Sequence, residues 1–186
     1  AAKTIPRGQY GWVQFIPHKS CNSEDEFTLF YEKAGAWLML LHIMVCSDMH
    51  YENIIACGSD PVPIDLETIL QSSPPEFGAD TASMTALNLA RFKIHQSVLK
   101  AGMLPSYSAA TRSQIHDMGS LNATNGSSVI GEWKNINTNG MRWVQVRRTS
   151  SEYPNIPHYQ SQYAQFGDFI PSFLDGFKRY GEFLIA

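Results

Sequence analysis

Three polar residues, Asp48, Asn53 and Asp65, stand at a spacing that suits phosphoryl transfer. Asp48 and Asn53 are five positions apart, and Asp65 lies twelve positions beyond Asn53. Enzymes of this chemistry place one Asp beside the acceptor hydroxyl, and an Asn and a second Asp hold the metal ions on the ATP phosphates. The catalytic loop of protein kinases has the same D-x-x-x-x-N spacing. The stretch therefore predicts a site for ATP and Mg²⁺.

The roles expected of these residues follow from where charge develops in the reaction. Charge gathers on the transferring phosphoryl group, so cations held by Asn53 and Asp65 would supply most of the stabilisation. Mg²⁺ takes few protein oxygens together with waters and phosphate oxygens, which one carboxylate and one amide can provide. Asp48 is the predicted catalytic residue that orients the hydroxyl and receives its proton. His50 is predicted to be catalytic too, near the γ-phosphate or Asp48, with a structural role bonded to a backbone carbonyl as the alternative.

Other polar residues leave more than one interpretation open. Glu67 could assist the metal, although a surface or ion-paired carboxylate is the more ordinary role. Arg147 and Arg148 form a basic spot that could meet a peptide or a phosphate, and a solvated face is the simpler alternative. The sequence has no G-x-x-x-x-G-K-[ST] motif, which argues against a P-loop nucleotidase.

A β-hairpin is predicted directly around the candidate site. Residues 53–57 and 62–65 read as its strands, with a turn at 58–61. Because the two ends of a hairpin return to the same place, Asp65 is expected beside Asn53. Single Asp and Asn residues are common in turns, so the prediction depends on the motif and the hairpin together.

A helix is predicted to deliver the Asp48 loop. Ser23 and Glu26 match a capping box, and apolar residues at a 3.6-residue spacing follow as far as Val45. The helix should end near Cys46. Gly35 in its interior weakens it slightly, which suggests close packing there.

Further elements are predicted on both sides of the site. Residues 10–16 read as a strand, and residues 85–101 as a helix. Residues 106–160, rich in Ser, Asn, Thr and Gly, are expected to form a long irregular excursion with one short hairpin at most. An amphipathic helix is predicted to begin around Pro171, which would lie in its first turn. Its apolar stripe is Phe173, Phe177, Tyr180 and Leu184.

Composition places the chain among ordinary globular proteins. Of 186 residues, 44% are hydrophobic and 17% charged, and the net charge is −3, with no basic excess to suggest nucleic acid. The start is too polar for a secretion signal, and the longest apolar run, residues 34–46, is too short to span a bilayer. Three cysteines without C-x-x-C favour reduced thiols in the cytoplasm. The missing initiator Met suggests an excerpt of a longer chain.

Several motifs, in order along nearly the whole chain, resemble the dehydratase domain of class II lanthipeptide synthetases. The segments that carry this resemblance are Tyr10-Gly-Trp-Val-Gln-Phe-Ile16, Cys21, Phe30-Tyr-Glu-Lys-Ala-Gly35, Ser47-Asp-Met-His-Tyr-Glu-Asn-Ile-Ile-Ala-Cys-Gly58, Pro61-Val-Pro-Ile-Asp-Leu-Glu-Thr68, Ser97-Val-Leu-Lys-Ala-Gly-Met-Leu-Pro105, Asn135-Ile-Asn-Thr-Asn-Gly-Met141, Asn155-Ile-Pro157 and Gly176-Phe-Lys-Arg-Tyr180.

The resemblance implies an α+β, kinase-like fold related to lipid kinases. Members of that family phosphorylate Ser and Thr of a precursor peptide with ATP and Mg²⁺, and then eliminate the phosphate to leave dehydroalanine or dehydrobutyrine. A linked zinc-dependent cyclase domain, expected downstream, adds Cys thiols to these products. Residues 1–20 would be the end of the N-lobe and the hinge, and residues 21–186 a mainly helical C-lobe with the catalytic-loop hairpin and a long irregular insertion. Asp48, His50, Asn53 and Asp65 match the family's kinase residues.

This sequence also departs from the family pattern. In that family the ATP-binding Lys belongs to an earlier strand, and the resemblance implies that the Arg of elimination would lie beyond Ala186. Ala101 replaces a common Thr, and Asn139 replaces the usual Asp. The excerpt alone is therefore expected to be inactive. Two alternatives stay open: a lipid or small-molecule kinase of the same fold, and a degenerate kinase-like module that binds peptide without catalysis.

Overall fold

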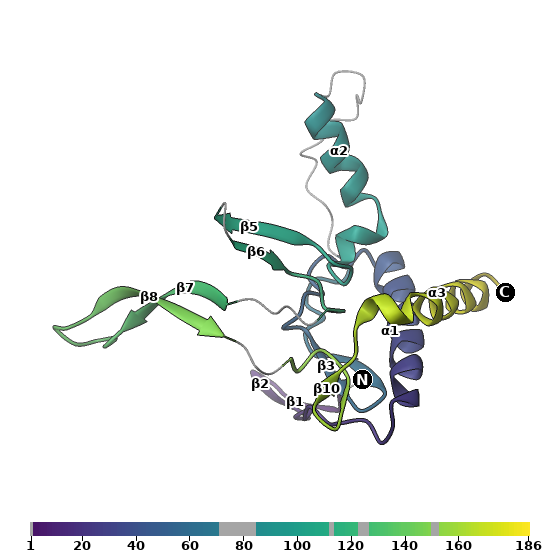
Figure 1. Ribbon diagram of the computed structural model, residues 1–186, viewed down its shortest axis with the longest axis horizontal. Coiled ribbons are helices and arrows are strands. Elements are labelled where there is room, and N and C mark those ends of the chain that lie inside the picture. The colour runs from purple at the N-terminus through teal and green to yellow at the C-terminus, as the bar shows by residue number, and fades with distance from the viewer. Residues whose placement is uncertain (1, 71–84, 112–113, 123–126, 150–152) are drawn as a thin grey trace.

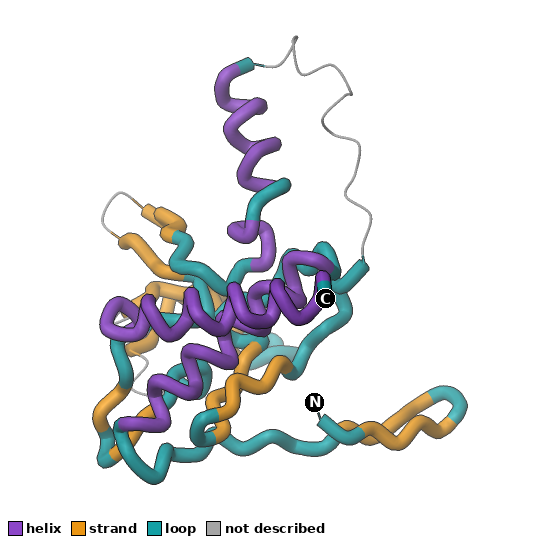
Figure 2. Tube along the Cα trace, turned by 90° about the vertical axis from the view of Figure 1, so that its right-hand side faces the viewer, coloured by secondary structure: helices purple, strands orange, loops and turns teal. Residues whose placement is uncertain are grey.

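Two crossing helices form the centre of the computed structural model, which describes residues 2–70, 85–111, 114–122, 127–149 and 153–186. Helix α1 spans Asp25–Ile43 and α3 spans Ile170–Ile185, and Figures 1 and 2 show them lying across one another. The crossing is close because it contains glycines: a Cβ on Gly35 would lie 1.9 Å from the Phe173 carbonyl oxygen, and one on Gly176 would lie 1.8 Å from that of Glu32. This confirms the close packing predicted at Gly35.

The core lies between α1 and the segments that follow it. The side chains of Phe30, Tyr31 and Ala34 are fully buried on α1. Rings from the α3 end of the chain stack on them: the Tyr31 and Phe169 centroids are 5.1 Å apart and nearly parallel. The remaining core members are Cys21, Phe27, Leu38, Leu41, Cys46, Met49, Ile54, Ala56, Ala101, Met103, Leu121, Ala164, Phe166 and Phe173.

Strands form five separate two-stranded antiparallel hairpins in the described part of the chain. The pairs are β1 (Thr4–Arg7) with β2 (Tyr10–Val13), β3 (Ile54–Cys57) with β4 (Asp60–Pro63), β5 (Tyr107–Thr111) with β6 (Gln114–Asp117), β7 (Ser127–Lys134) with β8 (Arg142–Thr149), and β9 (His158–Tyr159) with β10 (Gln162–Tyr163). The other helical elements are α2 (Ala86–His95), η2 (Val98–Ala101) and η3 (Phe166–Phe169). The structure is thus a mixture of helices and small antiparallel sheets, and its kinship to kinases stays a prediction.

The predicted irregular excursion over residues 106–160 is wrong in its main point. Instead of one short hairpin, this region contains β5–β6, β7–β8 and the first strand of β9–β10. The chain is consequently less dominated by helices than the sequence suggested. Strand β1 was not predicted either, because Pro6 interrupts a very short run, yet it pairs with β2 across a turn at Gly8 (φ 53°). The strand expected to reach residue 16 ends at Val13.

Helix boundaries differ from the prediction in two places. The capping box of Ser23 and Glu26 does not form: α1 begins at Asp25 without a side-chain cap, and Glu26 instead accepts hydrogen bonds from the backbone and side chain of Asn22, at 2.9 and 2.8 Å. The helix predicted for residues 85–101 is divided, because the Ser97 hydroxyl accepts from Leu99 N at 3.2 Å and caps a new helix, η2. The final helix is confirmed, with Pro171 in its first turn.

The three cysteines are free thiols, and Cys21 and Cys46 are buried. Burial raises the pKa of the Cys21 thiol to about 11, with the Glu26 carboxylate adding to the effect. A thiol with so high a pKa is rarely a nucleophile, which fits the structural role predicted for it. Among the helices that the structure describes, none is both long and apolar enough to cross a membrane.

Candidate functional site

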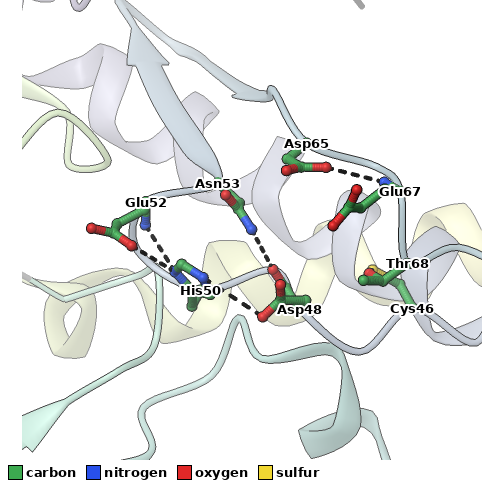
Figure 3. A network of polar contacts seen from close by, with 8 residues as sticks. All are labelled: Cys46, Asp48, His50, Glu52, Asn53, Asp65, Glu67 and Thr68. Atoms are coloured by element: carbon green, nitrogen blue, oxygen red, sulfur yellow. Dashed lines mark hydrogen bonds and ion pairs between the residues drawn. The ribbon is translucent and has the colours of Figure 1, made fainter.

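The β3–β4 hairpin brings Asn53 and Asp65 to the same end of two paired strands (Figure 3). Ile54 pairs with Pro63, and the Ile64 amide donates to the Asn53 carbonyl at 3.0 Å. The prediction of this hairpin is confirmed with a shorter turn: Gly58 (φ 61°) and Ser59 connect the strands, so β4 starts at Asp60 and ends before Asp65. A two-residue turn with glycine in the left-handed region fits the twist of paired strands.

The side chain of Asn53 closes the loop that carries Asp48. Its amide nitrogen donates to the Asp48 carbonyl oxygen at 2.7 Å, and its backbone N–H donates to the His50 carbonyl at 3.0 Å. The amide nitrogen is therefore occupied on the loop side, which leaves the amide oxygen on the opposite side (Figure 3). An oxygen in that position can ligate a cation.

His50 lies against Asp48, as the sequence predicted. The Glu52 backbone N–H donates to His50 Nδ1 at 3.2 Å, so Nδ1 is the acceptor and Nε2 carries the ring proton. His50 Nε2 is 3.6 Å from Asp48 Oδ1. The imidazole is largely shielded, while about half of the Asp48 side chain is exposed. The ring thus holds one side of a carboxylate whose other side faces solvent.

Asp65 is exposed immediately after β4 and turns the chain through its own side chain. Its Oδ1 accepts from the Glu67 N–H at 3.1 Å, which is an Asx-turn. This hydrogen bond orients the Asp65 carboxylate, with Oδ1 bonded to the backbone and Oδ2 in a position to bind a cation. Next to it, Thr68 Oγ1 is 3.4 Å from Cys46 Sγ and fastens the segment to the end of α1.

The loop rests on two backbone supports that far parts of the chain supply. Met49 N donates to the Ala101 carbonyl at 2.8 Å, at the end of η2. Gly102 follows with φ 82°, and a Cβ there would come within 3.2 Å of Met49 N. On the other side His50 forms an isolated bridge with Gly119, and the Tyr51 N–H donates to the Met118 carbonyl at 3.3 Å. The loop is clamped between these two turns.

Asp117 is a residue of the site that the sequence analysis missed. It is 5% exposed, and its carboxylate accepts from Ser106 N and Gly119 N, each at 2.8 Å, and from Asn122 Nδ2 at 3.1 Å. These bonds build the turn on which His50 lies. An Asp two residues before a Gly is an available signal for an Asx-turn, but its burial cannot be seen from the sequence.

The side-chain oxygens at the site are of the kind that ligate a hard cation with few protein ligands. The part of the chain that the structure describes has no group of three or more His, Cys, Asp or Glu side chains placed to hold a metal ion. Asn53 and Asp65 together offer an amide oxygen and a carboxylate, which is the kind of pair that Mg²⁺ uses beside phosphate oxygens and water. Nearby, burial and the Glu52 carboxylate raise the pKa of Tyr51, which keeps that phenol neutral.

Comparisons with known proteins give two matches. The family described as "Domain of unknown function (DUF4135)" matches residues 1–186. The "Lacticin 481/lactococcin biosynthesis protein LcnDR2" of Lactococcus lactis subsp. lactis is 36% identical to this chain over 102 residues. That stretch is 55% of this chain and 11% of that protein, so the chain matches only a small part of this curated relative.

Proposed function

We propose that this chain is part of an enzyme that modifies a precursor peptide. The chain belongs to the family described as "Domain of unknown function (DUF4135)" and is a distant homologue of a lacticin 481 biosynthesis protein. The reaction is phosphorylation of Ser and Thr hydroxyls with ATP, followed by elimination of the phosphate to dehydroalanine and dehydrobutyrine. The fold is proposed to be kinase-like. A cyclase domain in the same protein would then use these products.

The observation that carries the proposal is the way Asp48, Asn53 and Asp65 surround one exposed end of the β3–β4 hairpin (Figure 3). In phosphoryl transfer the acceptor oxygen attacks the γ-phosphorus, the bond to ADP breaks, and the hydroxyl proton leaves. The half-exposed Asp48 carboxylate can orient the hydroxyl and take that proton. His50, with its Nε2 proton toward Asp48, would hold the carboxylate in that direction.

Asn53 and Asp65 are the residues that would hold Mg²⁺ and, through it, ATP. Bound there, Mg²⁺ would neutralise charge on the transferring phosphoryl group. The backbone partners of both side chains support this role: Asn53 has its nitrogen turned to Asp48, and Asp65 has one oxygen on Glu67 N. Each side chain is therefore oriented before any ligand arrives, which reduces the reorganisation that binding costs.

Elimination requires removal of the α-proton and departure of the phosphate, and two residues of this chain bear on it. Ala101, where the resembling family has Thr, is buried and contributes its carbonyl oxygen to the Met49 N–H. Asn139, where that family has Asp, lies in the exposed turn between β7 and β8. Neither side chain can act as a base, so the proposal for this chain centres on the phosphorylation step.

The test is a mass measurement on the reaction of the full-length protein. The protein is incubated with ATP, Mg²⁺ and a Ser- and Thr-containing precursor peptide, and peptide mass is followed over time. The proposal predicts gain of a phosphoryl group followed by loss of the elements of phosphoric acid, one water lower than the starting peptide. A peptide of unchanged mass would contradict it. In parallel incubations, phosphate transferred to a lipid or a small molecule instead of the peptide would support the lipid or small-molecule kinase. Peptide bound in an anisotropy measurement but never phosphorylated would support the non-catalytic module.

A further inference from the structure

The β7–β8 ribbon, residues 127–149, reaches away from the helical core and plays no part in the candidate site (Figure 1). Its strands pair over eight residues each. In the described part of the chain neither strand has a third strand on its outer edge, and the ribbon's contacts with other elements are few. A two-stranded ribbon that stands alone is only marginally stable in water, and its free edges are open to another chain.

Two tryptophans form an exposed apolar surface on one face of the ribbon. Trp133 and Trp143 are direct partners across the strands, with ring centroids 5.3 Å apart in an edge-to-face arrangement. They are 50% and 56% exposed. The Trp143 ring lies over Gly131, where a Cβ would stand 1.9 Å from Cζ2, so glycine makes room for the indole. Paired, exposed indoles are typical of binding surfaces.

The ribbon is also basic in a chain that is acidic overall. Residues 127–149 contain four basic residues and one acidic residue, a net charge of +3, whereas the whole chain has a net charge of −3. Lys134 and Arg142 are register partners next to the tryptophan pair. Since neighbouring residues of a strand face opposite sides, they lie on the face opposite to the indoles. Glu132 pairs with Lys134 on that face.

We propose that the β7–β8 ribbon docks an extended peptide segment with acidic and large apolar side chains, which adds as a third strand along one of its edges. A free edge binds a peptide through backbone hydrogen bonds. The side chains of an added strand alternate between the two faces, so apolar ones would reach Trp133 and Trp143 while acidic ones would reach the basic face. This proposal rests on the proposed function in one respect: the peptide that binds the ribbon would be the precursor peptide that the enzyme modifies.

A peptide fits these observations better than a nucleic acid or a membrane does. The excess of positive charge belongs to one narrow ribbon and the rest of the chain is net acidic, which gives little surface for a long polyanion. Backbone groups along both edges serve only a partner that has peptide groups of its own. The indoles lie on the face opposite to Lys134 and Arg142, whereas a peripheral membrane site needs its apolar and basic side chains against the same bilayer.

The binding test uses the full-length protein without ATP and three fluorescein-labelled peptides, each eight residues long like β7. The first alternates Glu with Tyr or Val, and the second has Lys in place of Glu. The third is the first peptide with Pro at two neighbouring central positions, which removes a backbone N–H group from each edge of the strand. Fluorescence anisotropy gives the affinities. The first peptide is expected to bind about tenfold or more tightly than the others. Equal binding of the Lys or the Pro peptide would overturn the proposal.

Variants locate the binding on the ribbon. We expect two double variants to lower the affinity for the first peptide about tenfold each. One is Trp133→Ser with Trp143→Ser, and the other is Lys134→Glu with Arg142→Glu. Trp12→Ser is the matched control, because Trp12 is 68% exposed on the β1–β2 hairpin and should leave the affinity unchanged. If both ribbon variants bind like the parent, the proposal falls. The proposal is also wrong if the ribbon variants lower the affinity for a DNA duplex or for phosphatidylserine vesicles and leave the affinity for the peptide unchanged.

The test separates docking from catalysis. Binding is measured again with Asp65→Asn, which should keep the affinity of the parent because Asp65 is not on the ribbon. Ribbon-dependent binding in a protein that phosphorylates no peptide would remove the proposed function and leave the docking surface. Phosphorylation with no ribbon-dependent binding would do the reverse.

Discussion

His50 sits between two partners that decide which ring nitrogen carries its proton. Glu52 N–H donates to Nδ1, so the ring proton is on Nε2, which lies 3.6 Å from Asp48 Oδ1. We predict that His50→Ala lowers the rate of peptide phosphorylation about 10²-fold, because Asp48 loses the group that orients it. The free energy of unfolding should change little in comparison. Stopped assays and urea unfolding measure the two effects, with Tyr51→Phe as the control. Loss of folding without a specific loss of rate would instead favour the structural alternative for His50.

Asp117 is predicted to act on the site through the backbone alone. Its carboxylate accepts three hydrogen bonds in a buried turn, so Asp117→Ala leaves several donors unsatisfied and should cost about 3 kcal/mol of stability. Asn122→Ala removes one donor and should cost about 1 kcal/mol. Urea unfolding of both variants checks this order. Equal costs for the two variants would show that the turn does not depend on the carboxylate.

At the scale of elements, the α1–α3 crossing depends on two glycines. Gly176→Ala would place a methyl group 1.8 Å from the Glu32 carbonyl oxygen, so the helices must separate. We expect a loss of about 1–3 kcal/mol in the free energy of unfolding. Gly167→Ala is the control, since nothing lies within 4 Å of a Cβ there. Thermal unfolding measures both variants, and an equally stable Gly176→Ala would contradict the close packing.

A histidine pair joins the segment after β2 to the β9–β10 hairpin. His18 Nε2 lies 3.1 Å from His158 Nδ1 and 3.2 Å from the Ile156 carbonyl. Burial, and then the neighbouring His18, lower the pKa of His158. The native state therefore binds fewer protons than the unfolded state, so stability is complete above the unfolded value of about 6.5 and declines as pH falls below it.

We predict a lower urea midpoint at pH 5 than at pH 7.5 for the parent chain. His158→Gln should reduce this difference, because it removes the group whose pKa is lowered. If His158→Gln keeps the full pH dependence, the pair is not its source.

Elements that bury one apolar face could be predicted from the sequence, whereas elements that stay exposed on both faces could not. Helices α1 and α3 present apolar stripes to each other, and β3 alternates buried and half-buried residues, so periodicity revealed them. The β7–β8 ribbon exposes both tryptophans and much of its length, and an unburied strand has no apolar alternation to detect. At the site, motif spacing was enough for the loop and hairpin, but the support from Asp117 depends on contacts across more than fifty residues.

In the whole molecule, distant segments meet under one loop. The Asp48 loop rests on Ala101 and on the turn that Asp117 builds. The Asn155 side chain, itself buried, donates to the Ser120 carbonyl at 2.9 Å and ties that turn to the last third of the chain. The site therefore depends on contacts between segments that lie far apart in the sequence. We expect the proposed activity to be lost together with tertiary structure.

Asp65 is proposed to hold the cation on which phosphoryl transfer would depend, and one pair of variants tests this role. Asp65→Asn removes the carboxylate charge, and Asp60→Asn removes a similar exposed carboxylate from the far end of β4, where it pairs with Lys33. Mass measurement of the precursor peptide with ATP and Mg²⁺ compares them in the full-length protein. We predict a loss of phosphorylation of about 10²-fold or more for Asp65→Asn and parental activity for Asp60→Asn. Full activity of Asp65→Asn would contradict it.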